Sequence, residues 1–126
     1  IPVLTNWIAA GGKIGGVLLD EGEWFNLGSP AQYLGAHRAI IECKWRPAYV
    51  QPPGWPVRIA PDAAVDSSAS ITGYSSIGAG CRIDAGATVA DSVLWPGAQI
   101  ASRTELKGCI VRAHHAVEGT HNDAII

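Results

Sequence analysis

The chain has 126 residues, a formal net charge of −2 and 48% hydrophobic residues, which is the size of one modest domain or two small ones. Its Lys and Arg residues are scattered singly, so no basic stripe suggests a nucleic-acid or anionic-membrane partner. No leader and no apolar run of membrane-spanning length is present, so we expect a cytoplasmic protein. Cys43, Cys81 and Cys109 form no CxxC pair, which disfavours both a disulfide framework and a zinc site.

Residues 1–46 are expected to form a small α/β segment. Leu4, Trp7 and Ile8 precede a Gly-Gly pair at residues 11–12, which predicts a short first helix. Residues 14–19 and 24–27 are apolar runs on either side of an Asp-Glu-Gly turn at residues 20–22, and they predict a two-stranded hairpin. Because a lone hairpin is marginally stable in water, this part of the chain is expected to need a partner surface.

A second helix is predicted to begin at Ser29. Serine at the N-cap, Pro30 at the first helical position and Gln32 in place to close a capping box are typical helix-start signals. The apolar residues follow at helical spacing and predict an end near residues 43–46; they are Tyr33, Leu34, His37, Ile40 and Ile41. The proline-rich stretch at residues 47–56 then predicts a stiff linker into a second unit, residues 57–126.

From residue 57 onward, large aliphatic residues recur every six positions. Neither the helical period of 3.6 nor simple strand alternation gives this spacing. The first aliphatic residues are Ile59, Val65, Ile71, Ile77, Ile83 and Val89. A row of small residues stands four positions after them, namely Ala63, Ala69, Ser75, Cys81 and Ala87. The two rows predict a left-handed parallel β-helix made of hexapeptide repeats, in a chain that is dominated by β-structure.

The six-residue period shortens by one residue twice, from Val89 to Leu94 and from Leu106 to Val111. Three hexads make one triangular coil, so the repeat predicts about three and a half coils with both short hexads between coils. Trp95, like Tyr74 one to two coils away, falls at a predicted corner. Since Trp and Tyr are enriched in protein contacts, such a residue either covers the edge of a coil or contacts a partner.

The row of small residues stops at His115 and His121, which stand four positions after Val111 and Val117. We therefore expect the β-helix to end near His115, with residues 114–126 capping the last coil or docking on a neighbouring chain.

His114 and His115 support a second interpretation of the chain. Hexapeptide-repeat acyltransferases resemble this fold, bind acyl-CoA between adjacent β-helices and use a histidine as general base, a role that suits a group titrating near neutrality. The other reading is that both histidines only cap the last coil, since no further catalytic groups accompany them. His121 would add a third potential metal ligand, but two adjacent positions rarely point to one site.

The stretch at residues 22–38 resembles the end of the catalytic domain of sugar-nucleotide pyrophosphorylases. The usual form there is Trp-x-Asp-Ile-Gly-Thr-Pro-x-x-Tyr-Leu, and the chain has Trp24-Phe25-Asn26-Leu27-Gly28-Ser29-Pro30-Ala31-Gln32-Tyr33-Leu34. Followed by hexapeptide repeats with one-residue slips, this motif makes the chain similar to the C-terminal portion of a mannose-1-phosphate guanylyltransferase or glucose-1-phosphate nucleotidyltransferase. The order of the two parts is more specific than either part alone.

The resemblance implies a position for magnesium at Asn26, where the family has an acidic ligand. An amide oxygen can bind a hard cation but brings no charge. The family's glycine-rich nucleotide loop, lysines and second metal aspartate belong to a part that this sequence does not contain, and Gly11-Gly12-Lys13 lacks the phosphate-loop spacing. The resemblance therefore implies a non-catalytic structural and oligomerisation module, a dimer or trimer joined through the β-helix. Magnesium and sugar-nucleotide chemistry would enter only with a catalytic domain or subunit.

Overall fold

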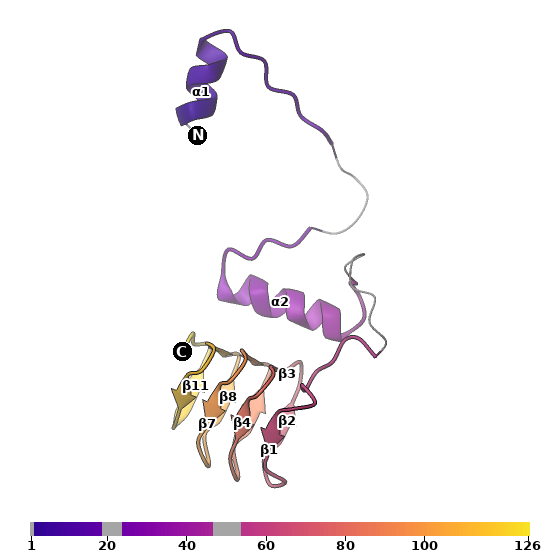
Figure 1. Cartoon of the computed structure of the whole chain (residues 1–126), viewed down its shortest axis with the longest axis vertical. Coiled ribbons are helices and arrows are strands. Elements are labelled where there is room, and N and C mark those ends of the chain that lie inside the picture. The colour runs from indigo at the N-terminus through magenta and orange to yellow at the C-terminus, as the bar shows by residue number, and fades with distance from the viewer. Residues whose placement is uncertain (1, 19–23, 47–53) are drawn as a thin grey trace.

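The computed structural model describes residues 2–18, 24–46 and 54–126. The predicted turn at residues 20–22 and most of the predicted linker lie outside these ranges. The described residues contain two helices, α1 (Pro2–Ala9) and α2 (Pro30–Ile41), followed by a series of short strands (Figure 1). The strands are β1 (Ala64–Val65), β2 (Ser70–Thr72), β3 (Ser76–Ile77), β4 (Arg82–Ile83), β5 (Thr88–Ala90), β6 (Val93–Leu94), β7 (Gln99–Ile100), β8 (Glu105–Lys107), β9 (Ile110–Val111), β10 (Ala116–Val117) and β11 (Thr120–Asn122).

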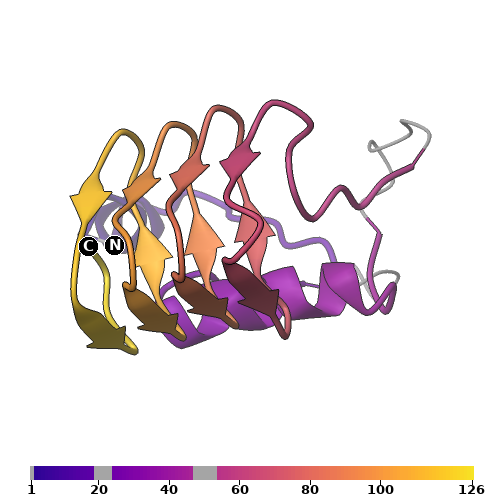
Figure 2. The same ribbon diagram turned by 90° about the horizontal axis from the view of Figure 1, so that it is seen from below.

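The strands form three parallel sheets that run along a solenoid. Sheet 1 has the order β1-β4-β7-β10, sheet 2 the order β11-β8-β5-β2 and sheet 3 the order β3-β6-β9. Each pair of neighbouring strands is parallel, as in Val65↔Ile83 and Ile71↔Val89. The chain therefore contributes one strand to each sheet before it advances to the next coil (Figures 1 and 2). This arrangement confirms the prediction of a parallel β-helix.

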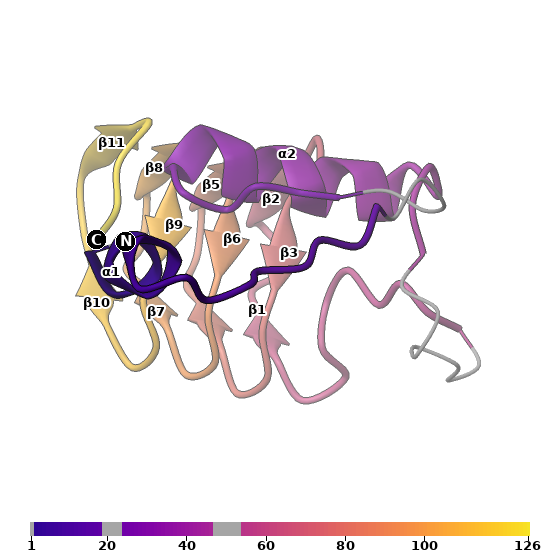
Figure 3. The same cartoon turned by 90° about the horizontal axis from the view of Figure 1, so that it is seen from above.

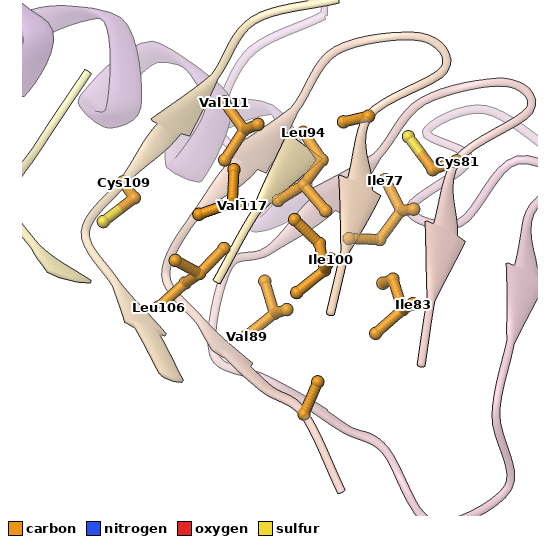
Figure 4. Close-up of a cluster of buried hydrophobic side chains, with 12 residues drawn as sticks. Ile77, Cys81, Ile83, Val89, Leu94, Ile100, Leu106, Cys109, Val111 and Val117 are labelled. Atoms are coloured by element: carbon orange, nitrogen blue, oxygen red, sulfur yellow. The ribbon is translucent and has the colours of Figure 1, made fainter. Parts of the chain in front are cut away.

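The core of the molecule is the interior of the β-helix (Figure 4). The large aliphatic side chains in it are at most 4% exposed, and they are Ile77, Ile83, Val89, Leu94, Ile100, Leu106, Val111 and Val117. Complete burial of one such side chain stabilises the fold by about 1.5–3 kcal/mol. Ile59 and Val65, predicted for the same interior, are 43% and 36% exposed. They belong to the first coil, which has a neighbouring coil on one side only.

Small polar side chains stabilise the corner between sheets 2 and 3. The Ser75 hydroxyl lies 2.7 Å from the Thr72 carbonyl oxygen and accepts a hydrogen bond from the Ser92 backbone N–H at 3.3 Å. The Ser92 hydroxyl in turn accepts the backbone N–H of Cys109 at 2.9 Å. All three side chains are buried, so this ladder satisfies backbone groups that water does not reach.

The shortened hexads lie at the same corner. Between β2 and β3 the chain has three corner residues, whereas the equivalent corners after β5 and β8 have two, as the pairs Thr72↔Ala90 and Ser76↔Val93 show. The first coil therefore has one more corner residue than the following two coils. The half-buried Tyr74 lies in the middle of this longer corner.

Helix α2 lies along the β-helix and crosses its coils (Figures 2 and 3). Its N-cap is confirmed, since the Ser29 hydroxyl accepts the backbone N–H of Gln32 at 3.3 Å. The helix ends at Ile41, a little before the predicted end, because Glu42 adopts a C-cap conformation. The Trp95 indole donates a hydrogen bond to the Tyr33 hydroxyl at 3.1 Å.

The other predicted corner aromatic also contacts α2. The Arg38 guanidinium lies over the Tyr74 ring, 4.3 Å from its centre. Val93 and Ile110 alternate with interior residues and so point outward from sheet 3, yet both are at most 5% exposed beside the helix. Trp95 and Tyr74 thus join the β-helix to α2 of the same chain.

Residues before α2 do not form the predicted hairpin. The first helix is present and ends as predicted, with the Gly11 N–H bonded to the Ile8 carbonyl at 2.9 Å. However, residues 14–18 and 24–27 are not strands, so this prediction is wrong for the described part of the hairpin. A strand needs a partner edge and a covered face, and neither is available to these residues. We call residues 2–18 and 24–28 the arm; α1 stands apart from the β-helix (Figure 1).

Candidate functional site

His114 lies at the corner between β9 and β10. Its backbone has φ 57°, and Gly80 and Gly97, with φ 63° and 74°, occupy the equivalent corners of the two preceding coils. A Cβ atom added to Gly97 would collide with the His114 ring. The exposed imidazole therefore lies over the preceding corner, in a left-handed backbone conformation that normally favours glycine.

His115 is also exposed, and strands β10 and β11 after it continue sheets 1 and 2, so the prediction that the β-helix ends near His115 is wrong. Its N–H donates to the Arg112 carbonyl at 3.3 Å, and its own carbonyl accepts the Gln99 N–H at 2.8 Å. Neither His114 nor His115 is among the residues that line the hollows described below. The structure thus places both candidate bases at one corner of the last coil.

His121 does not follow the row of small residues. It pairs in register with Leu106, a large interior residue, so the predicted equivalence to Ala or Thr positions is wrong. The corner before β11 contains only Glu118 and Gly119, and this shorter turn shifts the register. A ring nitrogen of His121 lies 2.9 Å from the Glu118 carbonyl oxygen. The half-buried His121 ring therefore lies at the C-terminal end of the interior.

Asn26, the position that the resemblance assigns to magnesium, lies in the exposed part of the arm. Its side-chain oxygen accepts the backbone N–H of Gly28 at 3.1 Å and so forms a turn ahead of α2. In the described ranges no group of three or more His, Cys, Asp or Glu side chains is arranged to hold a metal ion. Asn26 therefore has no described carboxylate cluster to supply the charge that its amide lacks.

A hollow of about 500 Å³ lies on sheet 1. Its charged groups are Arg82, Asp84 and Glu118, and its floor includes Ala101 and Ala116. Arg82 Nε lies 2.7 Å from Asp84 Oδ1, so the cation is already paired with the residue that follows β4. The hollow is a trough on a flat sheet rather than an enclosed pocket with convergent polar groups.

A cluster of charged residues fixes the C-terminal end of α2. Lys44 Nζ lies 2.6 Å from Glu42 Oε2, and Arg38 Nε lies 3.0 Å from Glu42 Oε1. Hydrogen bonds from Lys44, Tyr74 and Arg38, in that order, lower the pKa of Glu42 to about 2. The sequence identified Tyr74 as a corner residue but missed this cluster, because only the fold brings Arg38 and Glu42 to that corner.

An apolar hollow of about 280 Å³ adjoins the other end of α2. Leu27, Tyr33, Trp95, Ile110 and Ile125 are among the residues that line it. Its apolar lining continues into the arm through Leu27, which is itself exposed.

The arm is the most apolar exposed part of the described chain. Its exposed large side chains are Val3, Leu4, Trp7, Ile8, Ile14, Val17, Leu18, Trp24 and Leu27. Val17, Leu18 and Trp24 are each more than 80% exposed. Neither described helix is long and apolar enough to span a membrane.

Comparisons of the chain with protein-family models, with curated proteins and with solved structures found no match.

Proposed function

We propose that this chain is a non-catalytic structural and oligomerisation module, in which the β-helix is the rigid scaffold and the arm docks on another protein body. The observation that carries the proposal is the contrast in burial within one chain. The β-helix buries most of its own aliphatic residues, whereas the arm leaves nine large apolar side chains exposed. Apolar patches of this size on soluble proteins are typical of interaction sites.

The exposed area of the arm is sufficient for a stable interface. A fully buried aliphatic side chain removes roughly 60–120 Å² from water, given 1.5–3 kcal/mol per side chain at 25 cal/mol per Å². Seven such side chains, with Trp7 and Trp24 counted at the same area, amount to roughly 500–1,000 Å². One partner in a standard protein interface contributes about 800 Å². Docking of the arm would therefore bury an area typical of specific complexes.

The sequence motif at Trp24, Gly28 and Pro30 supports one class of partner. Because this motif resembles the end of a sugar-nucleotide pyrophosphorylase domain, the arm would complete a nucleotidyltransferase domain that lacks this element. The six-residue spacing of the β-helix, of the hexapeptide-repeat kind, fits the same family order. Nucleotidyl transfer to a sugar phosphate, with magnesium, would then be carried out by the partner.

The test has two parts. The chain alone is assayed with magnesium, GTP and mannose 1-phosphate or glucose 1-phosphate, and we expect no turnover. The chain is then titrated by calorimetry into a mannose-1-phosphate guanylyltransferase catalytic domain that lacks its own C-terminal element, and we expect a one-to-one complex. Trp24→Arg should weaken this complex, whereas Val57→Arg, an exposed apolar residue outside the arm, should leave it unchanged.

Acyl transfer is the alternative function that the experiment must distinguish from the structural role. A specific ligand at one hundred times its dissociation constant stabilises a protein by about 2.7 kcal/mol. Stabilisation of this size by acetyl-CoA, lost in a variant with His114→Ala and His115→Ala, would contradict the structural role. Turnover by the isolated chain, or absence of binding to the catalytic domain, would also count against the proposal.

A further inference from the structure

Sheet 2 has an outer face whose side chains lie in two columns. Because side chains alternate along a strand, the residues before and after each interior residue point away from the core. The first column is Ser70, Thr88, Glu105 and Thr120, and the second column is Thr72, Ala90, Lys107 and Asn122. A shallow hollow of about 240 Å³ lies on this face. The face therefore consists of short side chains around one carboxylate and one ammonium group.

The two charged side chains of this face are unpaired. Glu105 and Lys107 are both exposed on β8. Among the residues that the structure describes, neither side chain has an ion-pair or hydrogen-bond partner. They lie at the same level of the sheet in different columns, so the face carries opposite charges side by side and no net charge.

The other two faces of the β-helix are less suited to pairing with a copy of themselves. On sheet 1, Arg82 is already bonded to Asp84 at 2.7 Å. Asp66 and Glu118, which follow β1 and β10, add two further carboxylates to that face. Sheet 3 lies under α2 (Figures 2 and 3). Sheet 2 thus combines an uncovered face with balanced, unpaired charges.

We propose that the outer faces of sheet 2 from two copies of this chain pack on each other about a two-fold axis parallel to the solenoid. Such an axis exchanges the two columns and keeps each strand opposite the same strand of the other copy. Glu105 of each copy then faces Lys107 of the other, and Thr88 faces Ala90. The inference rests on the proposed oligomerisation role and names the surface that performs it.

A second copy is the favoured occupant because it supplies both missing charges at the required positions. The arm of the same chain does not supply them, since residues 2–18 and 24–28 contain Lys13 but no carboxylate. Complementary charges fix register and partner choice more than they add affinity. The face offers eight outer residues, fewer than the roughly 20–30 on each side of a standard interface. We therefore expect a weak dimer with a defined two-fold geometry.

The first test is sedimentation equilibrium at low salt, with protein concentrations up to roughly 1 mM so that a weak dimer is populated. We expect a dimer that dissociates as salt rises, because salt screens exposed charges. Glu105→Lys and Lys107→Glu should each raise the dissociation constant by roughly tenfold or more, since like charges then face each other twice. Glu118→Lys makes the first charge change at an exposed residue of sheet 1 and should leave the dimer unchanged.

The second test uses the symmetry of the contact. Differently tagged Glu105→Lys and Lys107→Glu chains are mixed in equal amounts. We expect a mixed dimer, because every lysine at these positions then faces a glutamate. A chain that carries both substitutions should dimerise like the parent, since the exchange restores both ion pairs. Because all these side chains are exposed and unpaired, the variants should fold like the parent.

The possible results separate this contact from the broader proposal. A dimer that persists in both charge variants, a trimer, or failure of the two variants to form a mixed dimer would overturn the two-fold contact and leave the oligomerisation role standing. A parent that is monomeric throughout would overturn both. Docking of the arm is tested independently by Trp24→Arg in the calorimetric titration, because Trp24 lies outside sheet 2.

Discussion

Leu106 and Leu18 show how differently the two halves of this chain treat the same side chain. Leu106 in β8 is 1% exposed, and Leu18 in the arm is 87% exposed. Between the first and last coils, each interior residue of the β-helix is covered by residues of the coils before and after it, so burial follows from the repeat itself. The arm has no repeating neighbour, so covering its apolar residues requires a surface from elsewhere. The β-helix thus buries most of its apolar side chains within its own fold, whereas the arm would bury its apolar side chains only on another surface.

The largest expected difference between the two regions is in the free energy of unfolding when each of the two leucines is truncated to alanine. Leu106→Ala should lower the free energy of unfolding by about 2–5 kcal/mol, since it removes a buried side chain and leaves a cavity. Leu18→Ala should change it by less than about 0.5 kcal/mol at concentrations where the chain is monomeric. Urea denaturation followed by circular dichroism measures both. Similar losses from the two variants would show that the arm is already packed in solution.

The β-helix was predictable from sequence because its interior contacts repeat at a fixed spacing. Ile77, Leu94 and Val111 are buried by the same arrangement one coil after another, so a period in the sequence becomes a stack in the structure. The hairpin prediction failed for the opposite reason. Residues 14–18 combine apolar residues with Gly15 and Gly16, which disfavour a strand, and apolar residues alone cannot supply the edge on which a strand depends.

A second, smaller effect is expected at the buried corner ladder. Ser92→Ala removes the hydroxyl that accepts the Cys109 N–H at 2.9 Å and leaves that buried donor without its partner. The expected loss of stability is about 1–3 kcal/mol. Ser102→Ala, at an exposed corner of the same β-helix, is the matched control and should change stability by less than about 0.5 kcal/mol. Equal losses would mean that water reaches the ladder.

The candidate site was less predictable than the fold. The sequence placed Trp95 and Tyr74 at corners, but it left open whether they contact a partner or cover the chain. Only the path of α2 shows that Tyr33 and Arg38 meet them. The register of His121 was missed because the short Glu118-Gly119 corner interrupts the period. The six-residue spacing predicts only the positions that repeat from coil to coil. The contacts of Trp95, Tyr74 and His121 depend on residues outside the repeat.

A gain in stability is expected from His114→Gly. His114 holds φ 57° at a corner where two earlier coils have glycine. A left-handed conformation costs a non-glycine residue about 1–2 kcal/mol, while the added chain entropy of glycine costs about 0.5–1 kcal/mol. The net gain should be below about 1.5 kcal/mol and visible as a higher urea midpoint. His115→Gly, outside the left-handed region, should lower the midpoint, and a gain from both would contradict the strain at His114.

The smallest expected effect is a pH dependence of stability that tests whether α2 packs on the β-helix or is exposed like the arm. His37 lies on α2 with its ring 4.7 Å from that of Tyr33, and burial lowers its pKa below 6.5. The unfolded chain therefore takes up a proton before the folded chain does as the pH falls. Stability should be highest above pH 6.5 and should decrease as the pH falls from 6.5 through the lower pKa of folded His37. In urea denaturation at a series of pH values, His37→Gln should flatten this slope and exposed His115→Gln should not. If stability changes equally with pH in the parent and in both variants, His37 is not buried and α2 is exposed like the arm. If the change depends on His37, α2 is packed on the β-helix.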